Sequence, residues 1–155
     1  MQANSHHSPA HGPRHPTGSL VAGVLAAVAF GLRVYHLAGQ SLWYDEAFSA
    51  YLAGMPPGEI IARTAADIHP PLYYFLLHGW ILVAGSSEFS LRYLSVLFGV
   101  LAVPLFYQLG ARLLAFLPGG VRKRDGLVAT FVAAIIPFYV WYSQEARMYS
   151  LLTFL

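Results

Sequence analysis

Three apolar stretches alternate with polar segments along the chain. They cover residues 19–38, 91–111 and 125–142, and each approaches the roughly 20 mostly apolar residues that a helix needs to cross a bilayer. A fourth stretch, 70–85, falls below the lower limit of about 17 residues. We therefore expect an all-α membrane protein with three spans and a helix over 70–85 that lies on the membrane surface. A short tilted span is the alternative for 70–85.

The first stretch has a second interpretation, because Ala-Val-Ala at 27–29 resembles the cleavage site of a secretory signal peptide. The polar leader before it is long and contains one Arg and four His. That length favours an uncleaved span. We expect residues 1–18 to form a disordered cytoplasmic tail and 19–155 to form the membrane domain.

Charge predicts the side of the membrane on which each polar segment lies. The segment 112–124 is basic and contains no acid, whereas 39–90 is acidic. Short loops rich in Lys and Arg stay cytoplasmic, so we expect the basic segment inside and 39–90 outside. The composition, 57% hydrophobic and 10% charged, agrees with a multi-pass protein of the cell membrane. The formal charge of +2 is too small to indicate nucleic-acid binding, and without cysteine there is no thiolate metal site.

The outer loop 39–90 is expected to contain two helices. The first runs through "LWYDEAFSAYLAG", starts at a cap supplied by Ser41 or Asp45, and ends at Gly54. The second begins after the prolines of "HPP" at 69–71, which suit a first helical turn. The polar residues 64–67 between them are expected to be loop.

Asp45 and Glu46 are the candidate catalytic residues. Adjacent helix positions point about 100° apart, so we expect one carboxylate to face the site and the other to hold the backbone. The alternative is that both are ordinary acids of a helix start, where the dipole favours negative charge. Arg92 and Arg147 stand where the second and third spans reach the same outer face, and Arg binds phosphate through a bidentate fork. Headgroup contact is the alternative for both arginines.

Aromatic residues and one histidine complete the candidate site. Trp43, Tyr44 and Tyr73 are candidates for contact with sugar or lipid, or belong to an interfacial aromatic belt. His69 is a candidate metal ligand that lacks any fixed ligand spacing, and a turn residue is the plainer interpretation. Whether a divalent metal or another cofactor is needed stays open.

Four motifs, in this order, carry a resemblance that covers 19–155: "WYDEAFSA", "HPPLYYFLLHGW", "SEFSLRYLSVLFG" and "YSQEARMYSLL". They resemble the N-terminal region of polyprenol-linked membrane glycosyltransferases. That group includes the dolichyl-phosphate-mannose–protein mannosyltransferases and the bacterial aminoarabinose transferases. The resemblance implies a GT-C-type helical bundle with many more spans, an active site on the outer face, and a catalytic aspartate at Asp45. It places Glu46 at the second acid, which not all members have, and Arg92 at an outer-loop arginine.

The expected reaction is transfer of a sugar from a polyprenyl-phosphate donor to a lipid, glycan or protein acceptor, with inversion at C1 in a single step. One ionised carboxylate acts as base, and a cation stabilises the leaving phosphate. We expect residues 1–155 alone to be inactive. The alternatives are a multi-span transporter, a noncatalytic membrane protein or an inactive truncated product. The absence of ionisable residues inside the expected spans, apart from Arg33 near an end, argues against transport.

Overall fold

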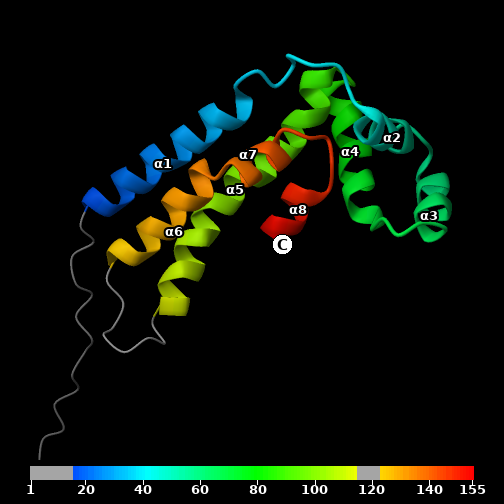
Figure 1. Cartoon of the computed structure of the whole chain (residues 1–155). Helices are drawn as coiled ribbons and strands as arrows, with labels where there is room; N and C mark the ends of the chain where they lie inside the picture. Colours follow the sequence, from blue (N-terminus) through cyan, green and yellow to red (C-terminus); the bar gives the residue numbers. More distant parts are fainter. Residues whose placement is uncertain (1–15, 115–122) are drawn as a thin grey trace, which may run out of the picture.

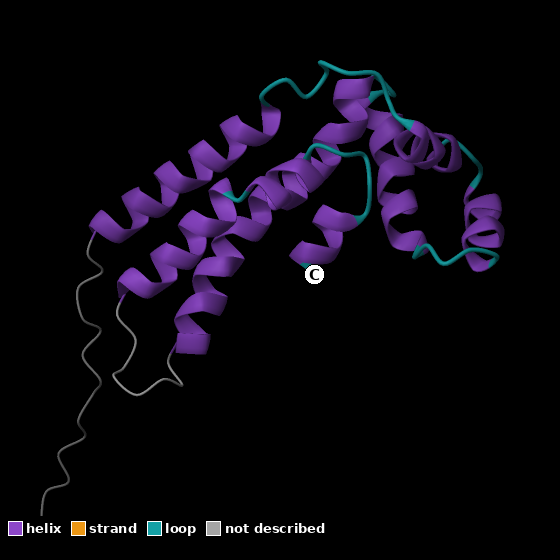
Figure 2. Cartoon of the chain, viewed as in Figure 1, coloured by secondary structure: helices purple, strands orange, loops and turns teal. Residues whose placement is uncertain are grey.

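The computed structural model describes residues 16–114 and 123–155, and this part of the chain is helical, with no strand (Figure 2). The expected all-α class is therefore confirmed. The described helices are α1 (Pro16–Val34), α2 (Tyr44–Ala53), α3 (Pro57–Ala65), α4 (Pro71–Ala84), α5 (Glu88–Leu114), α6 (Lys123–Ile135), α7 (Pro137–Ser143) and α8 (Tyr149–Phe154). Residues 1–15 of the predicted tail and 115–122 of the predicted basic loop lie outside the described residues. The remaining tail residues, 16–18, belong to α1, so the tail was predicted to extend too far.

The helices form a long bundle with a smaller group at one end. Helices α1, α5 and α6 pack against one another along their lengths, and α7 and α8 also pack against α5 (Figure 1). Helices α2, α3 and α4 gather beyond the N-terminal end of α5, where α4 packs against α2, α3 and α5. The C-terminal end of α5 and the N-terminal end of α6 lie at the opposite end of the bundle. The acidic segment 39–90 and the two helix ends that flank 115–122 thus lie at different ends of the bundle.

One helix of the described residues, Glu88–Leu113, is long and apolar enough by itself to cross a membrane. A second crossing is possible if the bent pair Gly126–Ile135 and Pro137–Ser143 counts as one span. The apolar helices Leu20–Val34 and Pro71–Ala84 are shorter than a full crossing. The helix expected over 70–85 is present, while its place on the membrane surface and the number of spans stay predictions.

The segment 39–90 contains the three helices α2, α3 and α4, so the expectation of two was wrong. Helix α3 lies between the two expected helices and begins with a proline, which suits a first helical turn. Neither Ser41 nor Asp45 caps α2, because the helix begins at Tyr44 and Trp43 occupies the cap position. The predicted end of this helix at Gly54 is confirmed.

The third apolar stretch, predicted as a span over 125–142, forms two helices in place of one continuous helix. Helix α6 ends before Pro137, and α7 continues at an angle of 57° to it. Proline has no N–H to give to the carbonyl four residues earlier, which here belongs to Ala133. The buried side chain of Arg33 satisfies the break, since its Nη2 donates to Ala133 O (3.0 Å) and its Nη1 to Ala134 O (2.9 Å). An arginine of α1 therefore stabilises the bend between α6 and α7.

The same guanidinium requires a close approach of α5. Arg33 Nε donates to Ser143 Oγ at 3.1 Å, and Gly99 of α5 lies directly against this pair. A Cβ at position 99 would come within 2.2 Å of Ser143 Oγ and 2.8 Å of Ser143 Cβ. A side chain at position 99 would therefore push α5 away from α7, because Ser143 Cβ cannot rotate aside.

We expect Gly99→Ala to lower the stability of the protein by about 1–3 kcal/mol, the cost typical of an overpacked core. Gly31→Ala is the matched control, since Gly31 lies in α1 and a Cβ there meets nothing within 4 Å. The control should be neutral or stabilising by up to about 1 kcal/mol. Reversible unfolding in mixed micelles measures both, and equal stability of the two variants would contradict this account of the contact.

Candidate functional site

A buried ion pair lies where the small helical group meets the bundle. Glu46 of α2 is 1% exposed, and its carboxylate accepts two hydrogen bonds from Arg92 of α5, from Nε at 2.8 Å and from Nη2 at 2.6 Å. The same carboxylate accepts the backbone N–H of Ala146 at 2.9 Å and that of Trp43 at 3.4 Å. Glu46 thus joins α2, α5 and the segment between α7 and α8.

The other N–H groups of Arg92 donate hydrogen bonds to backbone carbonyls. Its Nη1 donates to Leu37 O (2.9 Å) and Gln40 O (2.8 Å), and its Nη2 donates to Ser41 O (3.2 Å). With the two bonds to Glu46, all five N–H groups of the guanidinium have an acceptor. In this arrangement Arg92 has no donor left for the phosphate expected from the sequence. It ties α5 to the segment between α1 and α2.

Asp45 has a different environment from its neighbour. Its side chain is 37% exposed, and its Oδ2 accepts a hydrogen bond from Nη1 of Arg147. The Arg147 guanidinium also lies 6.0 Å from the ring centroid of Trp43 and 5.1 Å from that of Tyr149. One carboxylate is therefore buried while the other is accessible, so the two adjacent acids have different contacts.

A hydrogen bond from α5 holds the backbone of Arg147 in place. Ser95 Oγ of α5 donates to Arg147 O at 3.1 Å and lies 3.0 Å from the hydroxyl of Tyr73. Burial raises the pKa of Tyr73 well above its ordinary value, so this hydroxyl stays protonated. Tyr73 is 1% exposed, so its ring lies in the core. Contact of Tyr73 with a sugar or lipid, which was predicted from the sequence, does not fit this burial.

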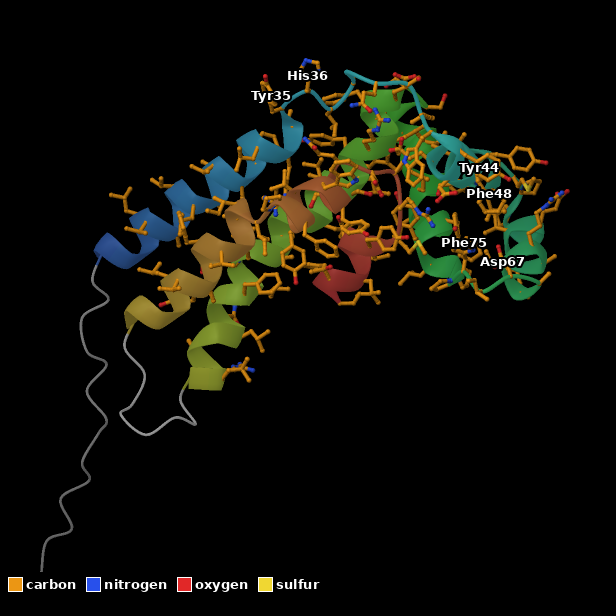
Figure 3. The ribbon with its side chains drawn as sticks, viewed as in Figure 1. Tyr35, His36, Tyr44, Phe48, Asp67 and Phe75 are labelled. Atoms are coloured by element: carbon orange, nitrogen blue, oxygen red, sulfur yellow. The ribbon has the colours of Figure 1, made fainter. Side chains whose placement is uncertain are left out.

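The other two aromatic candidates are accessible. Tyr44 is 82% exposed and points outward from α2, on the same helix as Phe48 (Figure 3). Trp43 is 49% exposed beside the Arg147 guanidinium. Both rings are therefore free to contact a ligand or a membrane surface, as expected.

His69 lies beside a single carboxylate. Its Nδ1 is 2.9 Å from Asp67 Oδ2, and this hydrogen bond is the main cause of the lowered pKa of Asp67. Among the described residues no group of three or more His, Cys, Asp or Glu side chains could hold a metal ion. The role of His69 as a metal ligand has no further ligand to support it in this part of the chain.

Two residues close to the site, Glu145 and Gln144, were not among the site residues predicted from the sequence. Glu145 Oε1 accepts a hydrogen bond from Trp141 Nε1 at 2.5 Å. Burial is the largest cause of its raised pKa. The spacing of four residues between Trp141 and Glu145 is one turn of a helix and was the available signal. Nearby, the Gln144 amide donates to the carbonyls that end α1, of which Tyr35 O is the nearest at 2.9 Å.

Comparison with protein-family models, with curated proteins and with solved structures finds no match to the chain. The function is therefore inferred from the contacts described above and from the sequence motifs to which these residues belong.

We expect Glu46→Gln to lower the free energy of unfolding by about 3–5 kcal/mol, because it leaves the buried Arg92 without a counter-charge. The control is Glu59→Gln on α3, whose pair with Arg63 is 3.9 Å long with both side chains more than half exposed. The control should change the unfolding free energy by less than about 1 kcal/mol. Indistinguishable unfolding midpoints for the two variants would show that the buried pair is not what holds this end of the bundle.

Proposed function

We propose that the protein is a multi-pass membrane glycosyltransferase of the GT-C type. It moves a sugar from a polyprenyl-phosphate donor to a lipid, glycan or protein acceptor. The observation that carries the proposal is the pairing of an accessible carboxylate, Asp45, with an arginine, Arg147, which lies between two aromatic rings. Both residues belong to motifs that resemble the polyprenol-linked transferases.

The reaction assigns one step to each of these two side chains. An acceptor hydroxyl attacks C1 of the donor sugar while its proton passes to the Asp45 carboxylate. The new C1–O bond forms as the bond from C1 to the phosphate oxygen breaks, and the electron pair leaves with the polyprenyl phosphate. Arg147 turns from Asp45 toward this phosphate and stabilises its charge. A single displacement of this kind inverts the configuration at C1.

Arg147 suits the phosphate better than Arg92 does. Its guanidinium donates to a carboxylate that is more than one-third exposed, and it lies beside two aromatic rings. Arg92 would have to give up a buried carboxylate and three backbone carbonyls to bind a phosphate. The cost of leaving those groups without partners makes such an exchange unfavourable.

The proposed site lies on the outer face of the cell membrane, with the N-terminus in the cytoplasm. Support comes from the charge difference between 39–90 and 112–124. The ends of α5 and α6 that flank 115–122 lie at the opposite end of the bundle from α2 and α3, which gives further support (Figure 1). In this orientation a lipid-linked donor reaches Asp45 from the membrane, and α4 and α5 supply the apolar surface beside it.

We expect Asp45→Asn in the full-length protein to reduce single-turnover sugar transfer by about 10²–10⁴-fold, because general-base catalysis typically contributes that much. The amide keeps the size of the side chain, so expression and unfolding midpoint should stay close to those of the wild type. Transfer of radiolabelled sugar from a polyprenyl-phosphate donor is the measurement, with Glu59→Gln as the control. Normal transfer by Asp45→Asn would contradict the proposal and return Asp45 to the role of an ordinary acid at a helix start.

A further inference from the structure

A pocket of about 270 Å³ opens beside the buried ion pair and is separate from Arg147. It lies where the segment after α1 and the first turns of α2 and α5 meet the end of α7. Trp43 and Trp141 supply its aromatic lining, and the buried pair of Glu46 and Arg92 borders it. Its other polar lining residues are His36, Gln40, Ser41, Gln144 and Glu145. Pockets for drug-sized ligands begin at roughly 300 Å³, so this volume suits one small ring.

The two indoles of the pocket are exposed and yet held in place. Trp43 is 49% exposed and Trp141 is 68% exposed. The hydrogen bond from Trp141 Nε1 to Glu145 fixes one ring, and the Arg147 guanidinium lies over the other. The negative face of an aromatic ring attracts positively polarised edges and cations. Such a face therefore suits the C–H surface of a sugar ring or an ammonium group.

The charges of the pocket disfavour an anion. The bordering ion pair is neutral, and each guanidinium N–H of Arg92 already has an acceptor. Glu145 adds a carboxylate, and no ion pair to it occurs among the described residues. Hydroxyl and ammonium groups can donate to this carboxylate. A phosphate or a uronic acid would meet like charge without a free cationic donor.

We propose that this pocket binds the ring of a neutral or amine-bearing sugar, and that this sugar is the acceptor; the second part rests on the proposed function. The ring lies between Trp43 and Trp141 and donates hydrogen bonds to Glu145. Arg147 does not line the pocket, so the donor phosphate and the acceptor ring bind at separate places that share Trp43 as a neighbour.

The test is saturation-transfer NMR titration of the full-length protein in lipid nanodiscs at pH 8, where histidine is ordinarily neutral. Nanodiscs avoid detergents with sugar headgroups, which would compete for the pocket. The probes are methyl glucoside, methyl glucosaminide and methyl glucuronide. We expect the first two to bind more tightly than the glucuronide, and Glu145→Gln to remove most of that difference.

The aromatic wall is tested with a matched pair on α7. Trp141→Ala should weaken binding of methyl glucoside by about two- to tenfold, the loss expected for one aromatic contact. Phe138→Ala should leave it unchanged, because Phe138 is 61% exposed on the same helix and does not line the pocket. Equal effects of these two variants, or glucuronide binding as tight as glucoside binding, would overturn the inference.

The result can be separated from the outcome of the proposed function. If sugar transfer depends on Asp45 but the affinity for glycosides is unchanged by substitution of Trp141 and Glu145, the assignment of the pocket is wrong and the proposed reaction stands. Glycoside binding that follows Trp141 and Glu145 in a protein without transfer would refute the proposed reaction and the assignment as acceptor. The pocket would then stand as a sugar-binding site.

Discussion

The ion pair between Glu46 and Arg92 is the contact on which the end of the bundle depends. Two charges taken out of water are expensive unless every donor and acceptor finds a partner. Here the carboxylate accepts from Arg92 and from two backbone N–H groups, and the guanidinium donates to three carbonyls besides. Because these partners come from distant parts of the chain, the pair fixes how α2, α5 and the segment after α7 meet.

A second buried arginine, Arg33, likewise links separate segments of the bundle through hydrogen bonds. Arg33 donates to the carbonyls left free where Pro137 interrupts the helix, and its Nε binds Ser143. The bent α6–α7 pair then leads into the residues that carry Glu145 and Arg147. In both places a planar fork with several donors satisfies backbone carbonyls that no helix bond can reach. The proposed chemistry is assigned to Asp45 and Arg147, whose side chains are 37% and 12% exposed.

The sequence predicted the helices and the grouping of charges better than the roles of single residues. Apolar length found α4 and α5, and charge asymmetry placed Asp45, Arg92 and Arg147 at one end. Which of the two adjacent acids is buried was not predictable, since this depends on where Ala146 and α5 approach α2. The break before Pro137 had a local signal in the proline itself, but its stabilisation by Arg33 is a contact between residues about 100 positions apart.

Double-mutant cycles measured in the unfolding free energy and in single-turnover transfer test the division of labour most directly. The account predicts a large coupling between Glu46 and Arg92 in unfolding, toward the upper part of the range of about 0.5–3 kcal/mol for contacting residues. Asp45 and Arg147 should couple by less than about 1 kcal/mol in unfolding and more strongly in transfer. An unfolding coupling between Asp45 and Arg147 that equals or exceeds that of the buried pair would contradict the account.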